Sequence, residues 1–365
     1  MLVLRRLFCN WEESDMVEWK TIKELCCPLK KAIIKQGNLI NDGCYPVINS
    51  GISLYGYFNE YNNDGNAFTF ASRGEYAGFV TYISEKFWAG GLCYPYRSKQ
   101  EDLYLTKYIY QYLKSKERNI MDTLVMRGGI PALNKVDVEK ISIPIPSKSE
   151  QERIVSILDT FTSSISNLKE QIKERRKQYE YYRDQLLDLE GKDGVEMKLL
   201  NESCIIQRGI RVVKKDLMQE GTIPVFQNSI APMGYYDKSN FPANVAYIIC
   251  AGSSSGSIGF CTVPFWAADD CLCVCSKDDT NNKFIYHYLH ARYPYIKTKV
   301  RGGAMPRLSR QVIENLKFPI IPFQEQLRIV TILDQFEASI ANLEAQLKER
   351  EKQYEYYRNQ LLTFV

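Results

Sequence analysis

The sequence predicts an α+β protein in which two mixed α/β domains are separated by two long helices, arranged as a pseudo-two-fold internal repeat. Three observations favour this fold class. Sequence motifs recur about 175 residues apart, each copy ends in about 40 residues with heptad periodicity, and short apolar runs broken by Gly, Asn and Pro precede each helical stretch.

Length and composition are typical of a soluble chain with two or three domains. The chain has 365 residues, 45% hydrophobic and 25% charged, and no run of about 18 apolar residues that could span a bilayer. Its start lacks the apolar stretch and cleavage site of a secretory signal, so we expect a cytoplasmic protein with no membrane partner and with reduced cysteines. No C-x-x-C pair occurs, and we expect no metal and a packing role for His287 and His290, the only histidines.

The internal repeat is most evident in Gln-Tyr-Glu-Tyr-Tyr-Arg, which occupies Gln178–Arg183 and again Gln353–Arg358. Further motifs pair across the two halves, with small insertions between them. They are Glu150-Gln151 with Glu325-Gln326, Ile157-Leu158-Asp159 with Ile332-Leu333-Asp334, Arg127-Gly128-Gly129 with Arg301-Gly302-Gly303, and Phe87-Trp88-Ala89 with Phe265-Trp266-Ala267.

Both helical stretches carry apolar residues at alternating steps of four and three. This spacing keeps a narrow stripe facing a partner helix, as in a coiled-coil seam. The seam residues are Ile154, Leu158, Phe161, Ile165, Leu168, Ile172, Arg175, Tyr179 and Tyr182 in the first helix, and Ile329, Leu333, Phe336, Ile340, Leu343, Leu347, Arg350, Tyr354 and Tyr357 in the second.

One position of each seam is arginine, Arg175 and Arg350. A polar seam residue usually fixes the register of the helices at some cost in stability. We interpret both arginines in this way, with the guanidinium reaching out to a carboxylate, and a partner-binding role is the alternative.

These patterns divide the chain into six segments: a leader at 1–16, a mixed domain at 17–147, a helix at 148–190, a linker at 191–196, a mixed domain at 197–321 and a helix at 322–365. The leader has no counterpart in the second half and is an irregular extension, a partner contact or translation from an upstream start. Within the domains, 246–250 and 271–275 should be strands, and 103–113 and 282–291 helices. Ser147 with Glu150 fits a capping box, and Gly191 and Gly194 follow the first helix as stop signals.

Charge is balanced overall, with a net value of +4, but one segment is strongly basic. Residues 280–313 contain seven Lys or Arg, no carboxylate and four interleaved tyrosines. Such a stretch is a candidate phosphate-binding surface, and a solvated basic face is an equally good interpretation.

Catalytic motifs are missing from the sequence. It has no G-x-x-x-x-G-K-[ST] loop, no dinucleotide-binding turn, no Pro-Pro pair for an amino-methyltransferase motif, and no deaminase H-x-E with C-x-x-C. The serines at 253–255 lack an evident base. We therefore expect no catalysis by this chain.

Taken in order and twice over, the motifs resemble the specificity subunit of a type I restriction-modification enzyme, across almost the whole chain. The residues that carry this resemblance are Tyr45-Pro46-Val47 with Gly56-Tyr57, the two Phe-Trp-Ala motifs, Gly128-Gly129 with Pro131 and Leu133, Glu150-Gln151 with Ile154, Gly302-Gly303 with Pro306 and Leu308, Pro319 with Pro322, and Glu325-Gln326 with Ile329.

The resemblance implies a DNA-reading scaffold without chemistry of its own. In that family two target-recognition domains each read one half of a split target in double-stranded DNA, and the two helices pack as an antiparallel coiled coil. Two methyltransferase subunits dock on the helices, and endonuclease subunits that translocate DNA join them. This implies that S-adenosylmethionine, ATP and Mg belong to the partner subunits and that this chain holds no cofactor. Helices of about 40 residues, roughly 60 Å long, would set the gap between the half-sites.

Candidate DNA contacts divide into positioning and reading residues. The phosphate candidates are Lys107, Lys114, Lys116 and Arg127 in the first domain, and Lys297, Lys299, Arg301 and Arg307 in the second. The candidates for base edges are Asn49, Ser50, Arg208, Arg211, Gln227 and Asn228. The Gly-Gly pairs either let another backbone approach or make a turn, and the turn is the favoured interpretation.

Two hypotheses of other classes compete with DNA recognition. A coiled-coil adaptor would assemble proteins without touching DNA, so charge reversal in the basic segment would leave DNA affinity unaltered. A self-contained nuclease or methyltransferase would show turnover from this chain alone.

Overall fold

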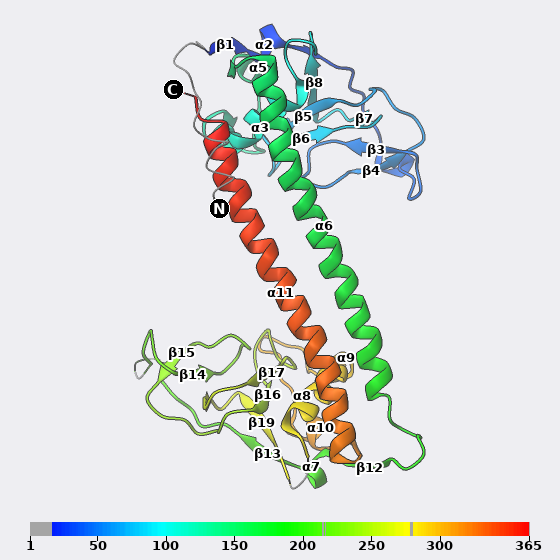
Figure 1. The fold of residues 1–365 in the computed structure, drawn as a ribbon, viewed down its shortest axis with the longest axis vertical. Coiled ribbons are helices and arrows are strands. Elements are labelled where there is room, and N and C mark those ends of the chain that lie inside the picture. Colours follow the sequence, from blue (N-terminus) through cyan, green and yellow to red (C-terminus); the bar gives the residue numbers. More distant parts are fainter. Residues whose placement is uncertain (1–16, 214, 216, 278–279, 365) are drawn as a thin grey trace. The chain divides into compact units, whose positions relative to one another are not determined.

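The computed structural model describes residues 17–213, 215, 217–277 and 280–364, which fall into two compact units (Figure 1). Unit 1 is Met1–Asn167 with Leu347–Val365, and unit 2 is Leu168–Gln346. The predicted leader at 1–16 lies outside the described residues.

Unit 1 is built on an antiparallel four-stranded sheet with helix α3 (Thr106–Ser115) packed on strands β5 and β6. In spatial order this sheet consists of β2 (Cys26–Pro28), β8 (Cys93–Ser98), β5 (Ala67–Ala71) and β6 (Val80–Ile83). A second sheet contains β4 (Gly56–Phe58), β3 (Tyr45–Ile48) and β7 (Trp88–Ala89), with β3 and β7 parallel. The smaller elements are β1 (Glu18–Thr21) paired with β11 (Ser142–Ile145), β9 (Val125–Met126) paired with β10 (Ala132–Leu133), the 3-10 turn η1 (Gln36–Asn38), and helices α2 (Ile22–Leu25), α4 (Glu117–Thr123) and α5 (Lys135–Glu139).

Unit 2 repeats the two larger sheets and the β1–β11 pair of unit 1, with α8 (Asn282–Ala291) in the place of α3; the β9–β10 pair is replaced by a single bridge between Arg301 and Arg307. Its four-stranded sheet consists of β13 (Cys204–Arg208), β19 (Cys271–Ser276), β16 (Val245–Ile249) and β17 (Ile258–Cys261). Its three-stranded sheet contains β15 (Gly234–Tyr236), β14 (Ile223–Phe226) and β18 (Trp266–Ala267). The smaller elements are β12 (Glu196–Leu199) paired with β20 (Lys317–Ile320), and helices α7 (Leu200–Ser203), α9 (Tyr293–Thr298) and α10 (Arg310–Glu314).

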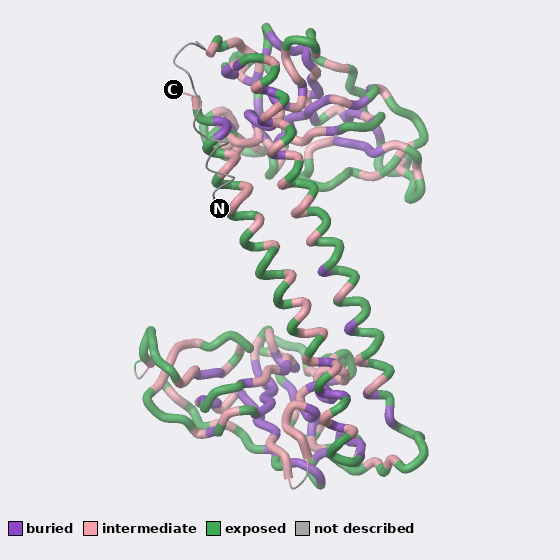
Figure 2. The backbone as a smooth tube through the Cα atoms, viewed as in Figure 1, coloured by how far each residue is buried: buried purple, intermediate pink, exposed green. Residues whose placement is uncertain are grey.

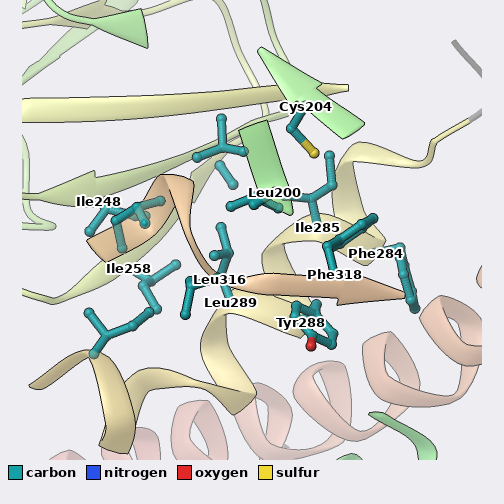
Figure 3. Packing of buried hydrophobic residues seen from close by; sticks show 14 of the residues in the cluster. Leu200, Cys204, Ile248, Ile258, Phe284, Ile285, Tyr288, Leu289, Leu316 and Phe318 are labelled. Carbon is teal, nitrogen blue, oxygen red and sulfur yellow. The ribbon is translucent and has the colours of Figure 1, made fainter. Parts of the chain in front are cut away.

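Aromatic packing between helix and sheet holds the core of unit 2 together (Figure 3). Phe318 of β20 meets Phe284 and Tyr288 of α8 edge-on, with ring centroids 5.8 and 5.2 Å away. All five residues of β16 are buried, which explains why this strand is an unbroken apolar run. Each fully buried Val, Ile, Leu or Phe side chain in this core contributes about 1.5–3 kcal/mol to folding.

Two long helices, α6 (Lys148–Leu187) and α11 (Phe323–Leu361), each pass from one unit into the other. The hydroxyl of Ser147 accepts a hydrogen bond from the N–H of Glu150 at 3.4 Å, as the predicted cap requires. Helix α6 ends at Leu187, three residues before the predicted end, and Gly191 and Gly194, with φ of 78° and 75°, follow it in the turns that lead to β12. Figure 2 shows that most of both helices is exposed or half-buried, while fully buried residues concentrate in the mixed domains.

Segments of α6 and α11 pair antiparallel within each unit. In unit 2, Arg176 of α6 forms an ion pair with Glu344 of α11 at 2.5 Å, and Tyr179, one turn later, reaches back to Glu337 at 3.3 Å. In unit 1, Phe161 lies 5.3 Å from the ring of Tyr357. Every predicted seam residue except Tyr182 is buried or half-buried, and Tyr182 stacks on Phe336 at 5.4 Å.

The prediction that the seam arginines reach out to carboxylates is wrong. The guanidinium of Arg175 lies over the ring of Phe336 at 5.9 Å, and that of Arg350 lies over Phe161 at 5.7 Å. Neither guanidinium forms an ion pair with any carboxylate that the structure describes. In each case a seam phenylalanine of the other helix offers the electron-rich face of its ring to the cation, so no buried carboxylate is required.

Candidate nucleic-acid interface

Two loops of unit 2 are pinned together by main-chain hydrogen bonds. One loop follows β16 and covers residues 251–256, and the other follows α9 and covers residues 301–307. The N–H of Gly252 donates to the carbonyl of Pro306 at 3.0 Å, and Arg301 and Arg307 exchange main-chain hydrogen bonds of 2.9 and 3.1 Å. The second loop is therefore a closed hairpin held against the first.

Predicted DNA contacts gather around these two loops. The ammonium of Lys297 donates to the carbonyl of Ser255 at 2.9 Å, and a Cβ at Gly252 would lie 3.5 Å from the Cβ of Asn228. The amide of Gln227 donates to Asp270 at 3.5 Å. We call the group gathered here the unit 2 interface; it comprises Arg208, Gln227, Asn228, Lys297, Arg301 and Arg307.

Arg208 joins this interface as the last residue of β13. Burial raises the pKa of the nearby Cys250 thiol to about 12, against the opposing positive charge of Arg208. Arg211 is exposed just beyond Arg208, and the ammonium of Lys299 lies 5.0 Å from the ring centroid of Tyr295.

Unit 1 has the same pair of loops with fewer of the predicted contacts. The N–H of Gly74 donates to the carbonyl of Pro131 at 2.9 Å, and exposed Arg127 lies 3.4 Å from Asp122. The side-chain oxygen of Asn49 accepts the N–H of Leu92 at 2.9 Å, so this end of Asn49 supports a turn, and Ser50 beside it is half-buried.

Three of the phosphate candidates in unit 1 already contact other side chains of that unit. Lys107 forms an ion pair with Asp159 of α6 at 2.6 Å, and Lys114 forms one with Glu117 at 2.6 Å while also donating to the carbonyl of Val80. The ammonium of Lys116 lies 5.7 Å from the ring centroid of Tyr112. The two ion pairs argue against a phosphate role for Lys107 and Lys114, because both ammonium groups are already neutralised.

The repeated Glu-Gln motif has a structural role that sequence reasoning missed. Gln151 is fully buried at the start of α6; it accepts the N–H of Leu105 at 2.9 Å and donates to the carbonyls of Leu103 and Pro146 at 3.0 Å each. Gln326 at the start of α11 accepts the N–H of Asn281 at 2.8 Å in the same way. Each glutamine thus ties a long helix to the loop before α3 or α8, and its recurrence in both halves was the available signal.

The Phe-Trp-Ala motifs are explained by a second repeated contact. Asn62 accepts the N–H of Ala89 at 2.7 Å and donates to its carbonyl at 3.1 Å, and Asn240 does the same for Ala267. The tryptophans also bond the main chain, with Trp88 donating to the carbonyl of Ala32. These hydrogen bonds hold each Phe-Trp-Ala segment against a neighbouring loop.

A polar cluster in unit 2 could be mistaken for a metal site. His287, Asp334 and Glu337 offer ligand atoms within 4.8 Å of one another. Lys283 lies 3.6 Å from Asp334 and 3.3 Å from Glu337, so a cation is already present and the donor set does not fit an added metal ion. Although burial opposes ionisation, the hydrogen bond from His287 and the charge of Lys283 hold the pKa of Asp334 below its ordinary value.

Ser255 of the serine-rich loop has a structural role. The hydroxyl of buried Ser255 donates to the carbonyl of Cys250 at 3.1 Å, which closes the turn after β16. The ring of His287, a possible base, instead forms a hydrogen bond with Asp334 at 2.8 Å.

Among the residues that the structure describes, no helix is long and apolar enough to cross a membrane.

Comparison with known proteins identifies both halves of the chain separately. The family of the type I restriction modification DNA specificity domain matches residues 15–175 and again residues 192–352. The chain belongs to this family. Membership makes it a specificity subunit rather than an enzyme in its own right, and the resemblance seen in the motifs is confirmed.

Individual relatives agree with this assignment. A type I restriction enzyme specificity subunit of Haemophilus influenzae is 29% identical, with 96% of this chain and 97% of the relative covered. The specificity subunit of a type I restriction enzyme of Escherichia coli is 30% identical over 71% of each chain. The crystal structure of the type I restriction-modification S subunit from Mycoplasma genitalium matches with a TM-score of 0.79 at 20% identity, covering 98% of both chains, and confirms the predicted fold class.

Proposed function

We propose that this specificity subunit reads a bipartite target in double-stranded DNA, with one mixed domain on each half-site. In this proposal α6 and α11 set the spacer and dock two methyltransferase subunits, which endonuclease/translocase subunits join in the cytoplasm. S-adenosylmethionine, ATP and Mg would be held by those partners. The observation that carries the proposal is the duplication itself: the family matches the chain twice, and each copy exposes the same pair of pinned loops.

The dimensions of the helices support a role in spacing. Helix α6 has 40 residues, so at about 1.5 Å per residue it is roughly 60 Å long, comparable with one to two turns of B-DNA. Because the two domains share topology but differ in sequence, the two half-sites need not be related by symmetry.

Exchange of one domain tests modular reading. Residues 17–147 are replaced by the first domain of another specificity subunit, and genomic DNA from cells carrying the complete complex is sequenced for methylated bases. We expect one half of the target to change while the other half and the spacer persist. The reciprocal exchange of 197–321 is the matched control and should change the opposite half. A change in both halves after either exchange would refute the proposal.

A further inference from the structure

The Gly-Gly pairs of the two units lie at the tips of matching loops, and the two glycines of each pair differ in what the fold demands. The second ones, Gly129 and Gly303, have φ of 131° and 145°, which favours glycine. The first ones, Gly128 and Gly302, lack a positive φ, and a Cβ on either would meet nothing within 4 Å. The fold therefore gives no reason for glycine at 128 and 302, although glycine costs conformational entropy there.

The same loops carry consecutive main-chain donors without acceptors. In unit 1 the N–H groups of residues 128–130 have no hydrogen-bond partner among the described residues. In unit 2 the same holds for residues 302–305. Each run ends at a proline, Pro131 or Pro306, whose carbonyl is fixed to the neighbouring loop. Successive main-chain N–H groups without partners can donate together to an anion where the chain bends around it.

The surroundings of both loops suit a polyanion. Arg127 precedes the first pair with two thirds of its side chain exposed, and Arg301 and Arg307 flank the second. No carboxylate occurs in residues 280–313, although Asp122 lies 3.4 Å from Arg127. Next to the free donors, Ile130 and Met305 are 75% and 57% exposed, so each tip also offers apolar surface to a sugar.

We propose that each Gly-Gly loop is a main-chain clamp for a phosphate of the DNA backbone. The free N–H groups donate to the phosphate oxygens, and the first glycine omits a side chain so that the sugar-phosphate chain can approach the loop closely. The inference rests on the proposed function, because it takes DNA as the ligand. It also assigns the loops to positioning rather than to base reading.

Alanine substitution separates this role from a structural one. Gly128→Ala and Gly302→Ala are compared with Gly37→Ala, an exposed glycine that likewise lacks a positive φ and has open space around it. Each variant is measured in the full complex by its melting temperature and by its Kd for duplexes with and without the target. We expect unchanged melting in all three, and binding weakened about tenfold on both duplexes for the two loop variants only.

Modified DNA tests the contact itself. Single phosphates of the target duplex are replaced by neutral methylphosphonates, which remove the anionic oxygen. In each half-site, one such replacement should weaken DNA binding by the unsubstituted complex. At that position in one half-site it should not weaken binding by Gly128→Ala any further, and in the other half-site the same should hold for Gly302→Ala. Full affinity of the loop variants, a fall in their melting temperature, or additive losses would each overturn the clamp. Failure of the unsubstituted complex to bind any duplex would instead overturn the proposed function.

Discussion

At the scale of single residues, the buried amide of Gln151 and the imidazole of His290 have testable effects on stability. Fully buried Gln151 bonds one N–H and two carbonyls; its bond to Pro146 is buried, and its bonds to Leu105 and Leu103 are half-buried. Such groups cost more when one partner is removed than a hydrogen bond contributes on balance. Each of the two glutamines therefore supplies polar contacts that join a domain to its long helix.

Substitution of that side chain should destabilise the protein. We expect Gln151→Leu to lower the free energy of unfolding by roughly 2–4 kcal/mol, because three main-chain groups lose their partner and the Pro146 carbonyl stays in a buried position. Urea denaturation followed by circular dichroism measures the loss. Gln178→Leu, at an exposed position of the same helix, is the matched control and should change stability by less than about 0.5 kcal/mol. Equal effects of the two changes would argue against a junction role.

His290 gives unit 2 a pH dependence with a defined sign. Burial lowers the pKa of His290 from its ordinary 6.5, and the charge of Arg183 adds to this effect. Glu337 opposes it, while His287 and Lys283 act with Arg183. The neutral form is favoured in the folded state, so the contribution of His290 to stability is complete above pH 6.5 and is lost as the pH falls through the lowered pKa.

Melting temperatures measured from pH 8 downward test this sign. We expect the unsubstituted protein to lose stability below about pH 6.5 and His290→Phe, which keeps a ring against Tyr179 and Tyr286, to lose less. The two curves should meet at high pH after correction for the different ring. A steeper acid loss in the variant would contradict the assigned direction.

At the scale of elements, the long helices are joined by a reciprocal contact. The seam arginine of each helix covers a seam phenylalanine of the other, Arg175 over Phe336 and Arg350 over Phe161. A cation–π contact of this kind contributes about 0.5–1 kcal/mol, and the methylene stem of arginine adds apolar packing. We expect this contact, which buries no charge pair, to help fix the register of the two helices.

A double-mutant cycle measures this contact. Arg350→Ala should lower the free energy of unfolding by about 1 kcal/mol, and Phe161→Leu should remove part of that effect, giving a coupling of about 0.5–1 kcal/mol. The matched pair is Arg350→Ala with Tyr356→Leu, since Tyr356 is an exposed residue of α11 that should show no coupling. Additive losses for Arg350 and Phe161 would mean that the arginine acts through another group.

The sequence predicted helices and repeats better than side-chain partners, for a physical reason. Heptad spacing and strand-length apolar runs are local, so α6, α8 and β19 lie close to their expected bounds. A lysine looks the same in sequence whether it faces solvent or Asp159, which lies 52 positions away, so Lys107 was assigned to phosphate. The seam position of Arg350 was predictable, but Phe161 as its partner depends on the helix register in space.

At the scale of the whole molecule, basic residues are numerous but not equivalent. Arg301 and Arg307 are exposed, Lys297 also donates to a carbonyl, and Lys107 and Lys114 are paired with carboxylates. Only free cations should release counterions from DNA. We therefore expect substitution of the exposed arginines to change DNA affinity, and substitution of the paired lysines to change stability.

Charge neutralisation tests that separation. Arg301→Gln with Arg307→Gln should weaken binding of the complex to any duplex and reduce the magnitude of the salt slope by about 1 for each phosphate that is no longer neutralised. Lys107→Gln with Lys114→Gln is the matched pair and should lower melting temperature while leaving the slope unchanged. An unaltered slope in the first pair would favour an adaptor that does not touch DNA.

The end of α11 has a consequence for how the chain is made. Leu361 and Leu362 are almost fully buried in the same core as Ile154, Leu158 and the first sheet. These two leucines are synthesised about 200 residues after α6 begins, so the core of the amino-terminal domain is complete only when the end of α11 has been made. We expect truncation before Leu361 to expose apolar residues of this core to solvent and to lower the stability of unit 1.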